Sequence, residues 1–232
     1  MSRVIVITGT RKGIGKELSE YYLKKGDIVI GCSRGRQSIV HDNYRHYKLD
    51  VIDEKDVVKM VRSTKREFGK IDILLNNAGI ASMNHFLTTP LTTVKNVFQT
   101  NFFGTFLFSR EVSKVMMKQK SGRIVNYSTV ASALDLEGES IYAASKCAIE
   151  SFTRTAAKEV APYGITVNAI GPTPTMTDLI KAVPKDKINE LIDKQSIKRL
   201  GNTEDIINVI DFFVDKKSKF ITGQVIYLGG VS

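Results

Sequence analysis

Tyr142 and Lys146 are four residues apart in the sequence Tyr-Ala-Ala-Ser-Lys, where a stretch with helical hydrophobic spacing begins. On a helix, side chains four positions apart lie on one face and can meet. A free phenol has a pKa of about 10, so it exchanges protons poorly at neutral pH unless a nearby ammonium favours the phenolate. Lys146 can supply that ammonium. Such a pair is more often structural than catalytic when it stands alone, so its meaning depends on the rest of the chain.

A glycine-rich turn follows the first apolar run, residues 4–7. Gly9, Gly13 and Gly15 have the spacing Gly-x-x-x-Gly-x-Gly, which differs from both the G-x-G-x-x-G and the phosphate-loop patterns. Glycines permit a sharp turn and let a pyrophosphate approach the backbone, and the N-terminus of a following helix favours anions. The turn therefore indicates a dinucleotide site, and an ordinary strand-to-helix turn is the alternative.

The elements that must position these residues alternate along the chain. Short Val- and Ile-rich runs predict strands, and amphipathic stretches between them predict helices. The expected strands are residues 4–7, 27–32, 44–49, 71–76, 123–127, 166–170 and 225–228, and the expected helices are 13–25, 53–68, 90–119, 142–162 and 203–215. This alternation predicts an α/β fold: a doubly wound Rossmann domain of about seven parallel strands with helices on both faces. Since no linker or repeat divides the chain, we expect a single dinucleotide-binding and catalytic domain over residues 1–232.

The end of the second expected strand bears on the choice of cofactor. NAD-binding proteins place a carboxylate there against the ribose 2′-hydroxyl. This chain has Ser33 and Arg34 instead, and Arg11 and Lys12 in the glycine-rich turn add cations. Cations, and arginine above all, suit a 2′-phosphate. We therefore predict NADP(H), with solvated surface cations as the alternative.

With these motifs in order, the chain resembles the short-chain dehydrogenase/reductase family over nearly its whole length. The motifs are Thr8-Gly9-x-x-x-Gly13-Ile14-Gly15, Asp50-Val51, Asn76-Asn77-Ala78-Gly79, Asn101, Tyr142-x-x-x-Lys146 and the stretch from Pro172 to Thr177. The resemblance implies an oxidoreductase that transfers a hydride between a nicotinamide cofactor and a carbonyl or alcohol substrate.

The resemblance also implies roles for individual residues. Tyr142 would be the general acid, Lys146 would bind the nicotinamide ribose and lower the pKa of Tyr142, and Asn101 would support a water that links Lys146 to solvent. The implied cofactor contacts are Gly9, Arg11, Lys12, Gly13, Ile14, Gly15, Ser33, Arg34, Asp50, Val51, Asn77, Ala78, Gly79, Tyr142, Lys146, Pro172, Thr173, Thr175 and Thr177. Asp50 and Val51 would hold the adenine, although Asp50 has an alternative role as the cap of the next helix.

The chain departs from the family pattern at three places. Thirteen positions before Tyr142, where the family usually has a serine that binds the substrate oxygen, stands Thr129, and Ser128 precedes it. A threonine hydroxyl has the same hydrogen-bonding capacity, so we assign the role to Thr129, with Ser128 as the alternative. Thr173 replaces a glycine that many relatives carry. Only fifteen residues separate Arg34 from Asp50, so we expect the helix after the second strand to be missing or reduced to a turn, and the adenine edge to be more open.

Charge and composition exclude several classes of function. The formal net charge is +10, which raises the possibility of a nucleic-acid binder. The cations are scattered and lack an aromatic-interleaved stripe, so we expect a solvated surface and no nucleic-acid partner. Two cysteines cannot form a disulfide framework, and the three histidines lack metal-ligand spacing, so no metal is expected. We see no targeting signal and no apolar run of about 20 residues, and expect a cytoplasmic protein without membrane contact.

Four of the five prolines fall within residues 161–194. We interpret residues 172–194 as a lid over the ligand site, with an ordinary surface loop as the alternative. Apolar residues on several faces of the helices near 90–119 and 142–162 favour a homodimer or homotetramer. They include Phe98, Phe102, Phe103, Phe106, Phe108, Met116 and Met117.

The resulting hypothesis is an NADPH-dependent carbonyl reductase that works in either direction. Around Tyr142, and at residues 168–170 and 221–224, the chain resembles 3-oxoacyl-[acyl-carrier-protein] reductases, which implies a small carbonyl substrate that is carried by a protein. A reductase of a keto-sugar, a nucleotide-sugar or another ketone is the alternative. From a different class, a non-catalytic regulator that senses dinucleotides stays open, although such a sensor has no chemical need for Asn101, Tyr142 and Lys146.

Overall fold

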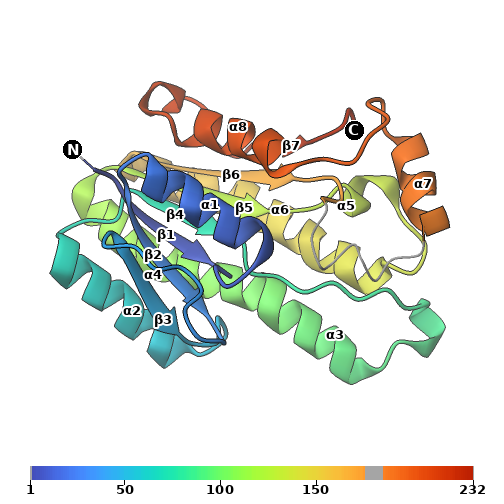
Figure 1. Cartoon of the computed structure of the whole chain (residues 1–232), viewed down its shortest axis with the longest axis horizontal. Coiled ribbons are helices and arrows are strands. Elements are labelled where there is room, and N and C mark those ends of the chain that lie inside the picture. The colour runs from blue at the N-terminus through green and yellow to red at the C-terminus, as the bar shows by residue number, and fades with distance from the viewer. Residues whose placement is uncertain (1, 176–184, 232) are drawn as a thin grey trace.

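The computed structural model describes residues 2–175 and 185–231 as a parallel sheet between two layers of helices (Figure 1). The seven strands lie in the order β3-β2-β1-β4-β5-β6-β7. They are β1 (Val4–Thr8), β2 (Ile28–Ser33), β3 (Tyr44–Lys48), β4 (Ile73–Asn76), β5 (Gly122–Tyr127), β6 (Ile165–Gly171) and β7 (Val225–Tyr227). Every pairing is parallel, so the predicted α/β class and all seven expected strands are confirmed.

The central strands are apolar because both faces of the sheet are covered. β1, β4 and β6 are buried along their entire length. Runs of this kind are typical of parallel sheets with helices on both sides. Helices α1 (Gly13–Lys24) and α8 (Thr203–Val214) pack on one face, around Leu18, Ile206 and Phe213. Helices α2 (Glu54–Phe68) and α4 (Gly104–Gln119) pack on the other, around Met60 and Phe108.

The longer helices begin and end close to the predicted residues. They are α1 (Gly13–Lys24), α2 (Glu54–Phe68), α3 (Leu91–Phe98), α4 (Gly104–Gln119), α6 (Ser140–Val160) and α8 (Thr203–Val214). α2 is capped by Asp53 and ends at Gly69, which has a φ of 74°, and α8 begins with a capping box formed by Asn202 and Asp205. These caps satisfy backbone groups that helix ends leave unpaired.

Several shorter elements were not predicted. A π-helical segment, η2 (Gln99–Phe103), joins α3 to α4, so the expected helix at 90–119 contains a local widening. The others are η1 (Phe86–Thr88), α5 (Ala131–Leu134), η3 (Ala161–Tyr163), α7 (Lys185–Lys194) and η5 (Lys216–Ser218). α7 falls within the predicted lid, whose residues 176–184 lie outside the described ranges.

The strand order reverses at the centre of the sheet, at a switch point that we call the crevice. From β1 the chain moves outward to β2 and β3, then crosses back to β4 on the other side of β1. Ligands of open parallel sheets bind at the carboxyl ends of the strands where the order reverses in this way. Residues 34–43, between β2 and β3, form no helix, as the short spacing predicted. Among the described residues, no helix is both long and apolar enough to cross a bilayer.

Candidate active site

The glycine-rich turn and the loop after β4 meet at this crevice. The Ala78 N–H donates to Thr8 Oγ1 at 2.9 Å, and Asn77 Nδ2 donates to the Thr8 carbonyl at 2.9 Å. Gly9 has a φ of +77°, which favours glycine. A Cβ at Gly15 would lie 2.4 Å from both Asn77 Nδ2 and the Gly9 carbonyl oxygen. The two motifs are therefore packed together, with backbone that only glycine permits.

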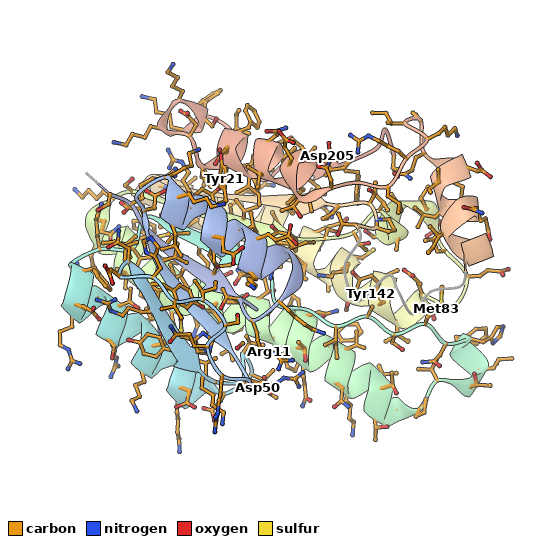
Figure 2. All side chains as sticks on the ribbon, in the orientation of Figure 1. Arg11, Tyr21, Asp50, Met83, Tyr142 and Asp205 are labelled. Carbon is orange, nitrogen blue, oxygen red and sulfur yellow. The ribbon has the colours of Figure 1, made fainter. Side chains whose placement is uncertain are left out.

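Thr129 and Tyr142 come together on the other side of the crevice. Thr129 follows β5, and Tyr142 lies in the first turn of α6 (labelled in Figure 2). The Thr129 hydroxyl lies near enough to the Tyr142 hydroxyl to favour its phenolate and so to lower the pKa of Tyr142. The pKa of Tyr142 is raised to about 12, mainly by burial; the Thr129 hydroxyl opposes this rise and the Glu139 carboxylate adds to it. The resemblance predicted a lowered pKa, and the structure differs because burial disfavours the phenolate more than the Thr129 hydroxyl favours it.

Lys146 lies one helical turn further along α6 and is 4% exposed. Its Nζ donates to the Tyr127 carbonyl at 2.8 Å and lies 5.7 Å from the centre of the Tyr142 ring. A Cβ at Gly79 would be 3.5 Å from this Nζ, so the loop after β4 reaches the same point. Burial lowers the pKa of Lys146 to about 8, because the charged ammonium loses its hydration.

Asn101 is completely buried in the π-helical segment. Its Oδ1 accepts from the Ile80 N–H at 2.8 Å, and its Nδ2 donates to the Ile80 carbonyl and to Ser145 Oγ, each at 3.0 Å. Short π-helical segments often occur at functional sites. Asn101 thereby fixes the loop after Gly79 against α6, beside Lys146.

Ser128 is turned away from Tyr142. Its hydroxyl hydrogen-bonds the Glu150 carboxylate and lies 3.2 Å from Ser132 Oγ. Successive side chains of an extended segment alternate in direction, so Ser128 and Thr129 cannot both face Tyr142. Of the two hydroxyls, the one that meets Tyr142 is that of Thr129.

Asp50 and Val51, which we expect to hold the adenine, follow β3. Asp50 Oδ1 accepts from the Ile52 N–H at 3.3 Å, whereas the cap of α2 is Asp53, which accepts from Asp56. The alternative role of Asp50 as the helix cap is therefore wrong. Val51 is buried, and a Cβ at Gly104 would lie 2.6 Å from Val51 Cγ2.

Of the predicted cations, Arg11 and Arg34 lie at the end of β2. The Arg11 side chain lies against Gly35, where a Cβ would be 2.6 Å from Arg11 Cδ. Ser38 Oγ donates to the Arg11 carbonyl at 2.8 Å, so the coil after β2 folds back onto the glycine-rich turn. Arg34 and Lys12 are both exposed nearby in sequence. Gly35 is a functional candidate that sequence reasoning missed, and its position beside Arg34 was the available signal.

His46 of β3 also lies at this end of the crevice. Its Nε2 is 3.3 Å from Ser33 Oγ and 3.1 Å from the Gly35 carbonyl oxygen. Its Nδ1 is 3.0 Å from the Tyr44 hydroxyl, which is 2.7 Å from Thr10 Oγ1. Only the strand register brings these side chains together, so the sequence pattern held no signal for them.

The segment after β6 completes the site. The Pro172 carbonyl accepts from Val130 N at 3.2 Å, and Thr173 Oγ1 accepts from Gly201 N at 3.1 Å. Thr173 and Thr175 are both buried, and Thr175 pairs with Gly201 in a parallel bridge. Thr177 lies outside the described residues.

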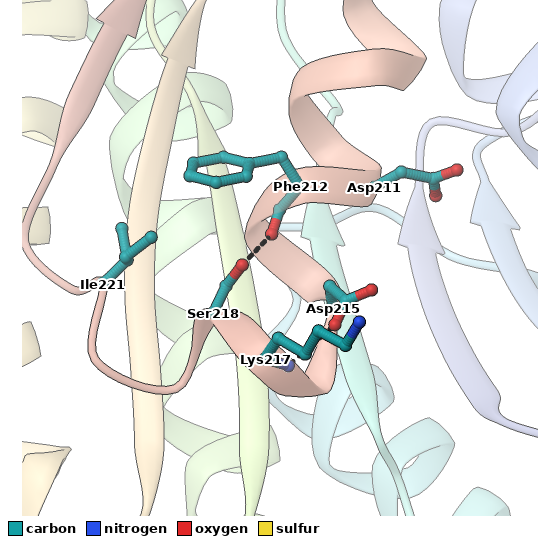
Figure 3. A pocket seen from close by; sticks show the side chains of 6 residues that line it. All are labelled: Asp211, Phe212, Asp215, Lys217, Ser218 and Ile221. Atoms are coloured by element: carbon teal, nitrogen blue, oxygen red, sulfur yellow. Dashed lines mark hydrogen bonds between the residues drawn. The ribbon is translucent and has the colours of Figure 1, made fainter.

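A separate cavity opens where α8 meets η5. It has a volume of about 490 Å³ and is lined by Asp211, Phe212, Asp215, Lys217, Ser218 and Ile221 (Figure 3). Ser218 Oγ donates to the Phe212 carbonyl at 2.5 Å across its wall. None of the predicted site residues lines this cavity, so it is distinct from the crevice.

Comparison with known proteins agrees with this geometry. The sequence model of the family described as short chain dehydrogenase matches residues 3–188. The chain is a short-chain dehydrogenase. Curated relatives of this dehydrogenase include the 3-oxoacyl-[acyl-carrier-protein] reductase FabG of Escherichia coli (strain K12), 30% identical over 98% of this chain and 96% of the relative. FabG of Vibrio cholerae is 31% identical over the same shares.

Several solved structures similar to the dehydrogenase carry nicotinamide dinucleotides. A structure described as ElxO with NADP bound superposes with a TM-score of 0.90 at 31% identity, covering 98% of this chain and 97% of that one. An NAD⁺-bound xylitol dehydrogenase also superposes with a TM-score of 0.90, at 29% identity over 98% of both chains. The dehydrogenase is thus an oxidoreductase that acts on CH–OH and C=O groups with a nicotinamide dinucleotide cofactor. This finding does not favour the non-catalytic regulator.

Proposed function

We propose that the dehydrogenase is an NADPH-dependent carbonyl reductase, with Tyr142 as the proton donor and Thr129 as the residue that binds the substrate oxygen. The observation that carries the proposal is the close approach of the Thr129 and Tyr142 hydroxyls beside the buried Lys146, whose Nζ lies 5.7 Å from the centre of the Tyr142 ring. A carbonyl oxygen between the Thr129 and Tyr142 hydroxyls would receive two hydrogen bonds, which polarise the carbonyl carbon.

When bound, the nicotinamide dinucleotide supplies the hydride for the carbonyl carbon. Tyr142 gives its proton to the carbonyl oxygen, so a C–H and an O–H bond form and the product is an alcohol. With a pKa of about 12, Tyr142 holds its proton at neutral pH, as a donor must. Lys146, with a pKa of about 8, is largely charged at neutral pH and stabilises the phenolate that Tyr142 leaves. Asn101 keeps the loop after β4 beside Lys146. Asn101 also supports a water that links Lys146 to solvent, so that a proton can return to the site.

The preference for NADP(H) rests on the end of β2. Residues 33–35 offer no carboxylate for a ribose hydroxyl, and Arg11 lies against Gly35 with Arg34 adjacent. Because Gly35 has no side chain, Arg11 can lie against the end of β2. There its guanidinium would be placed to bind a 2′-phosphate. The other proposed contacts follow the crevice around the dinucleotide, from Gly9, Lys12, Gly13, Ile14, Gly15 and Ser33 through Asp50, Val51, Asn77, Ala78 and Gly79 to Pro172, Thr173 and Thr175.

As substrate we propose a 3-oxoacyl thioester held on a carrier protein, in line with the FabG relatives. The net charge of +10 suits an acidic carrier. The xylitol dehydrogenase neighbour favours polyols or keto-sugars as the second candidate class. We also propose a homodimer or homotetramer, because the Phe103 and Phe106 side chains, at the junction of η2 with α4, are 50% and 38% exposed.

Calorimetric titration with NADPH and NADH tests the cofactor. We expect NADPH to bind about 10- to 100-fold more tightly, which corresponds to one or two charge-assisted hydrogen bonds. Arg34→Glu should remove that preference, while Arg66→Glu, on the exposed side of α2, should keep it. Equal affinity of the unsubstituted protein for NADH and NADPH would contradict the proposal.

A further inference from the structure

Glu150 is a buried carboxylate that the proposed chemistry does not use. It lies on α6, eight residues after Tyr142 and four after Lys146, so the three follow one side of the helix. It is 7% exposed. Carboxylates are rarely buried unless they are paired or hydrogen-bonded.

Three hydroxyl groups from three different elements surround one oxygen of this carboxylate. Glu150 Oε1 accepts from Ser128, at the end of β5, from Ser132 of α5 at 2.7 Å, and from Tyr227 of β7 at 2.7 Å. Hydrogen bonds to an ionised acceptor are about twice as strong as neutral ones. Glu150 therefore ties α6 to the segments on both sides of Thr129 and to the last strand.

Thr129 lies in the sequence between two of the residues that bind Glu150, Ser128 and Ser132, and it is hydrogen-bonded to Ser132. Ser132 Oγ lies 2.6 Å from the Thr129 carbonyl oxygen, and the Ala131 N–H donates to Thr129 Oγ1 at 3.3 Å. Ser132 has one proton for two acceptors, Glu150 and the Thr129 carbonyl, so its position responds to both. Ser132 thereby connects the Glu150 carboxylate to the turn that carries the Thr129 hydroxyl.

Tyr227 reaches Glu150 across a glycine. A Cβ at Gly171 would lie 2.3 Å from Tyr227 Cδ1 and 3.4 Å from the Thr129 carbonyl carbon. The absence of a side chain at Gly171 lets the Tyr227 ring lie over β6, directly behind the Thr129 backbone. The cluster of Glu150, Ser128, Ser132 and Tyr227 thus lies behind the Thr129 backbone. Glu150 itself is not among the side chains proposed to contact the substrate.

We infer that Glu150 is a positioning residue, which holds the Thr129 hydroxyl against Tyr142 through Ser128 and Ser132. The inference rests on the proposed function of Thr129. If Glu150 acts through Thr129, its substitution should lower turnover only while the Thr129 hydroxyl is present. A purely structural role would instead lower turnover independently of Thr129.

A double-mutant cycle tests this coupling with Glu150→Gln and Thr129→Ala, using acetoacetyl coenzyme A as substrate and NADPH absorbance as readout. Glu150→Gln should lower kcat by about tenfold with unchanged KM for NADPH, and should have no further effect in the Thr129→Ala background. Glu159→Gln, an exposed change on the same helix, should match the unsubstituted enzyme. Losses that multiply, or an unchanged kcat in Glu150→Gln, would overturn the inference.

Hydrogen exchange supplies a readout that does not depend on turnover. In Glu150→Gln the peptide covering residues 128–134 should exchange faster than in Glu159→Gln, and unchanged exchange there would overturn the inference. If the unsubstituted enzyme reduces no substrate, the proposed function fails, while the exchange experiment still decides the role of Glu150. Should Glu150→Gln not fold, Ser132→Ala removes the same link and takes its place in both experiments, with the same outcomes for and against.

Discussion

Replacing Lys146 by methionine should change how stability depends on pH. Lys146 is almost fully buried, and burial lowers its pKa from 10.5 to about 8. A difference of that size corresponds to about 3 kcal/mol of unfavourable free energy for keeping the ammonium charged in the folded protein. Methionine has a similar length and no charge, so Lys146→Met removes this cost. It also leaves the Tyr127 carbonyl without its donor, which costs about 1–3 kcal/mol.

The two effects separate when pH is varied. Between about pH 8 and pH 10.5 the unfolded chain binds more protons at this lysine than the folded chain does, so stability rises with pH. From about pH 7 to about pH 9.5 the unsubstituted protein should gain about 2 kcal/mol from Lys146, and the methionine variant should gain none of it. The free energy of unfolding of the variant relative to the original should therefore fall by that amount.

Urea denaturation followed by circular dichroism at the two pH values measures this difference directly. Lys158→Met, an exposed change on α6, serves as the control and should keep the pH dependence of the unsubstituted protein. If the Lys146→Met and unsubstituted proteins gave parallel stability curves, Lys146 would not be desolvated, and the reasoning about its role beside Tyr142 would be refuted. NADPH turnover should vanish in Lys146→Met whatever its stability.

Three other changes give distinct outcomes. Thr129→Ala should lower kcat by about 100-fold and Ser128→Ala by much less, because only Thr129 meets Tyr142; steady-state kinetics with the reverse ranking would reassign the role. Asp211→Asn should cost about 1–3 kcal/mol in urea unfolding, since Asp211 accepts from Lys25, Tyr21 and Tyr22. Burial raises the pKa of Asp211, but these bonds outweigh it and lower the pKa overall, so the loss should shrink as pH falls below about 4; a pH-independent loss would contradict this. Phe106→Lys should shift gel-filtration elution towards the 25.8 kDa monomer, whereas a monomer before substitution would contradict the proposed oligomer.

The sequence carries much of the fold because buried parallel strands are continuous apolar runs. The residues of β1 and β6 are recognisable in this way, and the glycine spacing after β1 indicates the crevice. The missing helix after β2 also follows from sequence, because fifteen residues cannot hold both a crossover helix and a strand.

Other features depend on contacts between distant segments. Our preference for Thr129 over Ser128 depends on Glu150, 22 residues further along the chain, which binds the serine hydroxyl. The pKa of Tyr142 follows from burial by neighbouring segments, and a motif does not record burial. The contact of Arg11 with Gly35 likewise arises from folding the coil after β2 onto the glycine-rich turn.

The central claim is that Tyr142 donates the proton in an NADPH-dependent carbonyl reduction. The most direct measurement compares the original enzyme with Tyr142→Phe in NADPH oxidation, over a panel of 3-oxoacyl thioesters, keto-sugars and simple ketones. We expect turnover of at least one substrate, a loss of about 100-fold or more in Tyr142→Phe, and unchanged affinity for NADPH in both proteins. Tight NADPH binding with no turnover of any substrate, or full activity in Tyr142→Phe, would contradict it.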